Sequence, residues 1–379
     1  MNKPCGREIP LSGSDITEKE KKAVLSVLES PYLSLGPRLP EFEEKMAEYI
    51  GTKYAIAVNS GTSALHLIVR ALGIGRGDEV ITTPFSFIAS ANCVLFENAR
   101  PVFVDIDPKT LNIDPDLIEK SITEKTKAIL AVDVFGHPAE WNKLELIAEK
   151  HGLKLIEDSC EAIGSEYKGR KAGSFGSAGT FAFYPNKQIT TGEGGMVVTD
   201  DTEVAEFCES SRNQGRSLGS EWLRHERLGF NYRLSDINCA LGTAQLERIN
   251  EILNKRDNAA QRYNTLLKDI SEIDLPYVSK DVKMSWFVYV VKLKKKFSKE
   301  QRDCIIGKLK EKGIGCSNYF SPIHLQPFYE KMFGYKKGDY PITEFISGRT
   351  IALPFYSNLK EDDAARVVHT FKEIIFDVS

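Results

Sequence analysis

The stretch FAFYPNKQITTGEGGMV, residues 181–197, decides how the rest of the chain is interpreted. The apolar residues 179–184 predict a buried strand, and the glycine-rich residues 190–195 predict a loop. Lys187 lies between them, with no charged neighbour before Glu193. We expect its amine to be partly desolvated, which lowers the pKa of a lysine and favours nucleophilic attack. The alternative is a solvated loop lysine above apolar neighbours, and this stretch alone favours that alternative.

Composition narrows the class of protein. The 379 residues carry 50 basic and 53 acidic side chains, for a net charge of −3, without a long basic run, so nucleic-acid binding is not expected. No apolar stretch reaches the roughly 20 residues that span a bilayer, and no signal peptide is expected. The seven cysteines are an odd number without a CxxC pair, which predicts free thiols in a cytoplasmic protein. The cysteines and the six histidines are dispersed, so no metal site is expected.

Short apolar segments alternate with helical patterns along the first 210 residues. We expect strands at 54–58, 79–83, 101–105, 128–134, 153–157, 179–184 and 196–199, with helices at 63–72, 86–96, 140–150 and from 200 to about 211. This alternation predicts an α/β fold whose large domain holds a mostly parallel central sheet flanked by helices. Ligands of such sheets bind at the carboxyl ends of the strands.

A second part of the chain is predicted after residue 250. Residues 235–269 have helical periodicity and form one long helix or two joined helices, of a length that often bridges two domains. A strand at 286–293 and a helix at 299–312 follow. We therefore expect a large domain over 1–250, with helices at 15–30 and 40–50, and a smaller C-terminal α+β domain over 251–379.

Three segments at strand ends carry candidate binding groups. The segment VNSGTSALHL, residues 58–67, places small hydroxyl residues and Gly61 between a strand and a helix, where backbone N–H groups can bind a phosphate. In TPFSFIASAN, residues 83–92, the ring of Phe87 could stack on a planar heterocycle. In LIEDSCEAIGS, residues 155–165, Asp158 ends a buried strand and could keep a pyridine nitrogen protonated.

Each of these segments also has an ordinary structural explanation. Serine and threonine at 60–63 and Asp158 could be N-caps of helices, and Phe87 could pack in the core. Taken together, a phosphate loop, an aromatic ring, an aspartate and a later lysine, in this order, describe a pyridoxal 5′-phosphate (PLP) site.

At this point the sequence resembles the DegT/StrS family of nucleotide-sugar aminotransferases, which are fold-type-I PLP-dependent enzymes. The resemblance covers nearly the whole chain. Its blocks include GPRLPEFEEKMAEYIGTKYAIAVNSGTSALHL, GDEVITTPFSFIASANCVLFENARPVFVDID, EDSCEAIGSEYKGRKAGSFGSAGTF, YPNKQITTGEGGMVVTD, LGFNYRLSDINCALGTAQLERI and YFSPIHLQPFY.

The resemblance implies roles for residues around the cofactor ring. Lys187 would hold PLP as the internal aldimine and move a proton between the substrate carbon and the cofactor. Asp158 would pair with the pyridinium nitrogen, and Phe87 would stack on the ring. Glu161 stands where the family often has Gln or His near the ring hydroxyl.

The same resemblance implies contacts further from the ring. Thr62 and Ser63 would bind the phosphate, and Asn231 would reach the phosphate of the neighbouring subunit, which implies a homodimer with shared active sites. His324 would line the sugar pocket.

One position departs from the family pattern. The family usually has a phosphate-binding serine five residues before the lysine, and this chain has Ala182 there. We expect Thr180, two residues back on the same strand face, or a water molecule to substitute. The predicted consequence is weaker PLP retention with activity preserved.

The resemblance implies transfer of an amino group, with L-glutamate as donor, to a keto-sugar linked to a nucleotide. Two alternatives stay open: a non-catalytic or regulatory PLP-binding protein, and another PLP reaction, such as that of a lyase or dehydratase. A dehydrating subgroup of the family has histidine in place of the lysine, and Lys187 argues against membership of it. The sugar, the nucleotide and the position of the ketone are not determined by these patterns.

Overall fold

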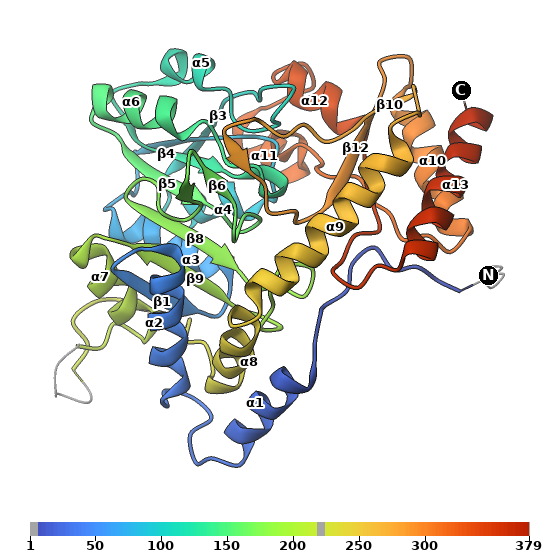
Figure 1. Cartoon of the computed structure of the whole chain (residues 1–379). Coiled ribbons are helices and arrows are strands. Elements are labelled where there is room, and N and C mark those ends of the chain that lie inside the picture. Colours follow the sequence, from blue (N-terminus) through green and yellow to red (C-terminus); the bar gives the residue numbers. More distant parts are fainter. Residues whose placement is uncertain (1–6, 218–223, 379) are drawn as a thin grey trace.

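A seven-stranded sheet occupies the centre of the larger part of the molecule (Figure 1). The structure is a computed structural model that describes residues 7–217 and 224–378. The sheet has the strand order β1-β9-β8-β5-β4-β2-β3. Its strands are β1 (Tyr54–Val58), β2 (Glu79–Thr82), β3 (Arg100–Phe103), β4 (Thr126–Val132), β5 (Lys154–Asp158), β8 (Ala178–Ala182) and β9 (Gly195–Thr199).

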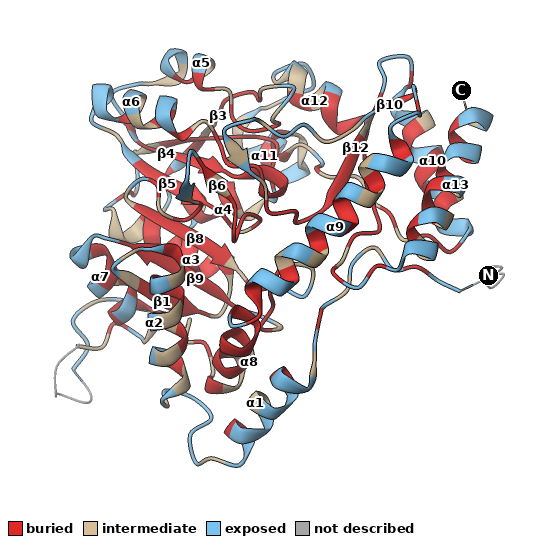
Figure 2. Cartoon of the chain, viewed as in Figure 1, coloured by how far each residue is buried: buried red, intermediate tan, exposed pale blue. Residues whose placement is uncertain are grey.

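The pairing confirms the predicted parallel sheet. The pairs β2–β3, β2–β4, β4–β5 and β5–β8 are parallel, whereas β9 runs antiparallel to both of its neighbours. The central strands are almost entirely buried (Figure 2), as expected for a sheet covered on both faces. The carboxyl ends of the parallel strands therefore meet at one edge.

Helices connect these strands and pack on them. The N-terminal helices are α1 (Glu18–Leu28) and α2 (Arg38–Ile50), and both contact α8. The remaining helices of this part are α3 (Gly61–Ala71), α4 (Ala89–Phe96), α5 (Pro115–Ile118), α6 (Trp141–His151), α7 (Thr202–Arg212) and α8 (Asp236–Leu246), with short 3-10 turns η1 (Glu119–Ser121) and η2 (Val134–Gly136). The predicted helix at 86–96 begins only at Ala89, because residues 83–88 form the turn that leaves β2.

The C-terminal part has its own sheet and its own apolar core. Its strands β10 (Ile273–Asp274), β12 (Tyr289–Leu293) and β13 (Thr350–Leu353) pair antiparallel in the order β10-β12-β13. The helices are α9 (Ile249–Leu267), α10 (Lys299–Glu311), α11 (Pro327–Phe333), α12 (Pro341–Ser347) and α13 (Glu361–Val378), with the 3-10 turn η3 (Ile323–Leu325). The predicted strand at 286–293 starts at Tyr289, after buried residues that enter the site described below.

The segment 235–269 forms two helices rather than one. Helix α8 ends at Leu246 and α9 begins at Ile249; Figure 1 shows α9 running from α8 towards the C-terminal sheet. Residue 250 thus falls in the first turn of α9.

A third small sheet joins β11 (Val282–Lys283) to β6 (Glu166–Tyr167) and β7 (Arg170–Lys171). The division into domains near residue 250 stays a prediction, because β11, which follows residue 250, pairs with β6, which precedes it.

Candidate active site

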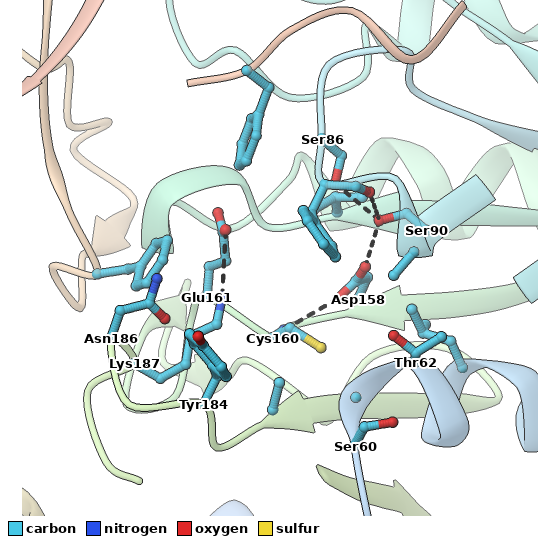
Figure 3. Close-up of a pocket in the computed structure, with 18 of the residues that line it drawn as sticks. Ser60, Thr62, Ser86, Ser90, Asp158, Cys160, Glu161, Tyr184, Asn186 and Lys187 are labelled. Carbon is cyan, nitrogen blue, oxygen red and sulfur yellow. Dashed lines mark hydrogen bonds and ion pairs between the residues drawn. The ribbon is translucent and has the colours of Figure 1, made fainter. Parts of the chain in front are cut away.

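A cavity of about 530 Å³ lies at the carboxyl edge of the central sheet (Figure 3). Its walls follow the ends of β1, β2, β4, β5 and β8 and the start of β9. The lining residues are Ser60, Gly61, Thr62, Leu65, Ser86, Phe87, Ala89, Ser90, Val132, Asp158, Cys160, Glu161, Ala182, Tyr184, Asn186, Lys187, Glu193, Gly194, Phe287, Tyr319 and Phe320. The topology thus brings four of the predicted segments to one place.

Lys187 points into this cavity and meets a carboxylate. Its Nζ lies 3.5 Å from Oε1 of Glu161, and the two side chains are 13% and 7% exposed. The same ammonium lies 4.0 Å from the centroid of the Phe287 ring, a cation–π contact. The expectation of a partly desolvated lysine is confirmed, and the alternative of a solvated loop lysine is wrong, because little of the side chain reaches water.

Glu161 is held in position by the backbone of the neighbouring loop. Its Oε2 accepts a hydrogen bond from the N–H of Phe135 at 2.9 Å. Burial, reinforced by the nearby Asp158, raises the pKa of Glu161, although Lys187 acts in the opposite direction. Glu161 thus presents a fixed and largely buried carboxyl group to Lys187.

Asp158 is fixed at the end of β5 by two donors. Its Oδ2 accepts from the hydroxyl of Ser90 at 2.7 Å, and its Oδ1 accepts from the N–H of Cys160 at 3.2 Å. The hydroxyls of Ser90 and Ser86 are 2.9 Å apart. The carboxylate is 4% exposed and lines the cavity, so it is presented to a ligand in one orientation.

The N-terminus of α3 forms another wall. Ser60 is the N-cap, accepting at 3.1 Å from the N–H of Ser63, and Thr62 lines the cavity. The hydroxyl of Ser63 donates to Oδ1 of Asn59 at 2.6 Å, and Ser63 is not among the residues that line the cavity. Backbone N–H groups of this first turn have no partner within the helix. The structure therefore places Thr62 and the helix end at the cavity, but not the side chain of Ser63.

Two glycines allow β9 and β8 to approach this helix end. A Cβ on Gly195 would lie 2.4 Å from the backbone carbon and oxygen of Ser60. A Cβ on Gly61 would lie 2.7 Å from Cβ of Ala182 and 2.9 Å from Sγ of Cys160. The glycine-rich stretch identified in the sequence thus serves close packing beside the cavity.

The departure at residue 182 is visible in the structure. Ala182 lines the cavity beside α3, where a serine hydroxyl would face the helix end. Thr180 is fully buried, is not among the residues lining the cavity, and its hydroxyl has no partner among the described residues. The expectation that Thr180 substitutes for the missing hydroxyl is not supported, because Thr180 lies one pleat deeper in β8.

Phe87 lies at the mouth of the cavity with 63% of its surface exposed. Packing in the core, the ordinary alternative for this ring, is therefore wrong. Its ring stays available to a ligand.

Two further predicted residues lie outside the cavity. Asn231 is exposed and its backbone carbonyl accepts from the side-chain amide of Asn59 at 3.4 Å. His324 is fully buried, contacts the ring of Tyr340, and has its Nε2 3.1 Å from a carboxylate oxygen of Glu344. The structure does not bring His324 to the cavity of this chain, because Glu344 and the surrounding aromatic rings enclose it.

Several lining residues were not predicted. Phe287, Tyr319 and Phe320 come from the C-terminal part of the chain, more than 90 residues after Lys187. No local pattern distinguishes them from core aromatics. Ser90 was recognisable, since its spacing from Ser86 puts both hydroxyls on one side of the turn entering α4.

Next to Asp158 in the sequence, Glu157 forms a fully buried pair of carboxyl groups with Asp133. The hydroxyl oxygen of Ser159 lies 2.9 Å from Oδ2 of Asp133 and 2.7 Å from Oε1 of Glu157. Burial raises the pKa of Asp133 to about 6, and burial together with the neighbouring Asp133 raises the pKa of Glu157 well above its ordinary value. These two groups do not line the cavity and are part of its support.

Comparison with known proteins places this geometry in a family. The profile of the DegT/DnrJ/EryC1/StrS aminotransferase family matches residues 14–372. The chain belongs to that family. It is 37% identical to GDP-perosamine synthase of Caulobacter vibrioides, over 97% of this chain and 98% of that protein.

Solved structures similar to this chain are also sugar aminotransferases. PseC of Helicobacter pylori, an aminotransferase involved in the biosynthesis of pseudoaminic acid, superimposes with a TM-score of 0.93 at 33% identity, covering 98% of this chain and all of that one. The Streptococcus pneumoniae protein Spr1654, solved in its PLP form, gives a TM-score of 0.94 at 30% identity over 98% of this chain and 100% of that one. The predicted fold-type-I architecture is confirmed, and this member of the DegT/DnrJ/EryC1/StrS family is a PLP-dependent sugar aminotransferase.

The residues at the cavity suit that cofactor. An amine on Lys187 can bond to an aldehyde, a helix N-terminus can receive a phosphate, and the fixed carboxylate of Asp158 can receive a pyridinium N–H.

Among the helices of residues 7–217 and 224–378, none has the length and apolar character of a membrane-spanning segment.

Proposed function

We propose that this enzyme moves an amino group from L-glutamate to the ketone of a nucleotide-linked sugar, through a Schiff base with Lys187. The observation that carries the proposal is that the mostly shielded Lys187 shares a cavity with a fixed aspartate and a helix N-terminus. GDP-perosamine synthase, a relative over nearly the whole chain, is named for an amino sugar on a nucleotide, which supports this substrate class.

Each lining group has a task in this proposal. Lys187 holds the cofactor, and after its release takes a proton from the donor's alpha carbon. Asp158 orients the ring nitrogen, Phe87 covers the ring face, and Thr62 with the first-turn N–H groups near Ser63 holds the phosphate. Bound PLP supplies an electron-poor ring that accepts the electron pair of the alpha carbon.

The donor and the acceptor are both anionic, and this favours a homodimer. Among the described residues that line the cavity, Lys187 is the only cationic side chain. The carboxylates of glutamate and a sugar diphosphate need further positive or N–H partners. A second copy could supply them, with its Asn231 segment reaching this site as the family resemblance implies.

Exposed apolar side chains near the N-terminus support an interface between copies. Residues 25–35 contain a group of large hydrophobic side chains that are 49–57% exposed: Leu25, Leu28, Tyr32, Leu33 and Leu35. Several exposed apolar side chains close together favour protein–protein contact.

We further propose a cytoplasmic location. The cysteines at 93, 160, 208, 239, 304 and 316 are free thiols, as expected in a reducing compartment.

We also propose a large domain over 1–250 and a small domain over 251–379.

An absorbance spectrum of the purified protein tests the chemistry. We expect a near-visible band that L-glutamate converts to the shorter-wavelength band of pyridoxamine phosphate, and that a nucleotide keto-sugar restores. The matched control is Lys187→Arg, which keeps the positive charge but cannot bond covalently to the aldehyde and should lack the starting band. If the protein takes up no PLP, or if Lys187→Arg gives the same spectrum, the assignment of Lys187 is wrong.

The same experiment separates the alternatives. A band that glutamate leaves unchanged, with release of water or ammonia from a sugar nucleotide, would indicate a lyase or dehydratase. A PLP-binding protein that turns over no sugar nucleotide, and whose Lys187→Arg variant keeps full biological function, would indicate a regulatory role.

A further inference from the structure

One carboxylate oxygen of Glu161 faces Lys187 and accepts no other hydrogen bond among the described residues. Oε2 of Glu161 already accepts from the N–H of Phe135 at 2.9 Å, whereas Oε1 faces Nζ of Lys187 at 3.5 Å. Both side chains are mostly shielded from water. Oε1 is therefore positioned to exchange a proton directly with the lysine, and bulk water has little access to the two groups.

A lysine must lose a proton before its nitrogen can attack a carbonyl carbon. Three carboxylates line the cavity within the described residues: Asp158, Glu161 and Glu193. Asp158 accepts from Ser90 and from the N–H of Cys160, and among the described residues no hydrogen bond or ion pair joins it to Lys187. Glu193 is exposed. Within 4 Å, Glu161 is the carboxylate that the described structure pairs with Lys187.

Building on the proposed function, we propose that Glu161 is the proton acceptor that converts the Lys187 ammonium into the free amine. One N–H bond of Nζ breaks and leaves its electron pair on nitrogen, while an O–H bond forms on Oε1. The ammonium–carboxylate pair becomes an amine–carboxylic acid pair, and the total charge does not change. The lone pair of Nζ is then available to a carbonyl carbon, and the proton can return when the lysine is released.

The surroundings of the pair act on its two forms in opposite directions. Burial favours the neutral pair and raises the pKa of Glu161. The Phe287 ring, 4.0 Å from Nζ, favours the ammonium. The other titratable groups facing the pair are Asp158, Cys160 and Tyr319.

The chain offers a conservative test. In Glu161→Gln the amide oxygen can still accept from Phe135, but an amide NH₂, which cannot take a proton, replaces the oxygen facing Lys187. In Glu161→Asp the acid is kept and moved back by one carbon. Glu166→Gln, on β6 outside the cavity, removes the same charge and serves as control. The probe is PLP itself, mixed with the cofactor-free full-length chain.

The measurement is the rate at which the near-visible band appears between pH 5 and 9, with borohydride trapping to confirm attachment at Lys187. We expect the wild-type rate to fall on the acidic side, as Glu161 becomes protonated and cannot accept. Glu161→Gln should attach PLP more slowly near neutral pH, by a factor on the order of 100. Its rate should keep rising with pH across the whole range, because the lysine proton must then leave to solvent. Glu161→Asp should keep the limb at an intermediate rate, and Glu166→Gln should match the wild type.

The outcomes separate this inference from the proposed function. A wild-type protein that attaches PLP while Glu161→Gln shows the same rate and pH profile overturns the inference alone. Should Glu161→Gln fail to fold by circular dichroism, Glu161→Asp decides, and absence of its acidic limb overturns the inference. A wild-type protein that attaches no PLP overturns the proposed function and this inference with it.

Discussion

The hydroxyl of Ser90 donates a 2.7 Å hydrogen bond to Oδ2 of Asp158, joining the first turn of α4 to the end of β5 inside the protein. Both residues are buried and both line the cavity. The bond fixes the carboxylate before any ligand arrives, which is the preorganisation expected for a group that must hold a ring nitrogen.

Ser90→Ala should weaken the hold on PLP. A hydrogen bond to a charged group contributes about 1.5–3 kcal/mol, so PLP affinity should fall roughly 10- to 100-fold. The measurement is a titration of the cofactor-free protein followed by absorbance. Ser86→Ala is the matched control, because Ser86 contacts Ser90 and not Asp158; equal losses in the two variants would contradict the role given to Ser90.

Ala182→Ser should tighten PLP binding. The new hydroxyl would face the N-terminal turn of α3 and offer one more donor to a phosphate, worth about 1 kcal/mol, or roughly fivefold in affinity. Thr180→Val is the control: it removes a buried hydroxyl without a described partner and should leave PLP affinity unchanged. If Ala182→Ser binds PLP no better than the wild type, the missing serine is not the cause of weak retention.

Phe87→Leu should change binding without changing stability. The ring is 63% exposed, so its loss should alter the free energy of unfolding by less than about 0.5 kcal/mol. Loss of ring stacking should weaken PLP binding by about 1 kcal/mol, or roughly fivefold. Chemical denaturation and PLP titration of the same preparation test both parts. A large loss of stability would indicate that Phe87 is a packing residue.

Asp133→Asn should change how stability depends on pH. Burial raises the pKa of Asp133 to about 6, and the pKa of Glu157 is raised as well, so the folded protein binds a proton that the unfolded chain releases. The resulting stabilisation is fully present below about pH 4 and is lost as the pH rises through about 6. An asparagine does not titrate, and its Oδ1 can keep the bonds from Ala139 and Trp141.

Unfolding curves of wild type and Asp133→Asn between pH 4 and 8 test this expectation. The variant should gain stability relative to the wild type as the pH rises, and Glu157→Gln should shift in the same direction. A difference between wild type and Asp133→Asn that stays constant with pH would show that the pair does not titrate in this range.

Much of the site could be predicted because each group stands next to a strand end in the sequence. Local patterns mark the segments that hold Lys187, Asp158, Thr62 and Phe87, and the family resemblance implies their roles. The parallel sheet brings them to one edge. The local patterns did not determine side-chain direction. The hydroxyl of Ser63 donates to Asn59 and Ser63 does not line the cavity, so its contact with a phosphate stays a prediction. His324 was expected in a pocket, yet it is buried against Glu344.

The sequence by itself determined the α/β architecture and the order of the segments that meet at the cavity, because strand periodicity, glycine placement and helix capping act over a few residues. The role of Lys187 followed from the resemblance of nearly the whole chain to the family. Only the tertiary structure decided that Glu161 faces Lys187, that Ser90 holds Asp158, and that Phe287 closes over the lysine from the C-terminal part. These contacts join residues 26, 68 and 100 positions apart. Their geometry depends on how strands, turns and helices pack together, which no local pattern contains.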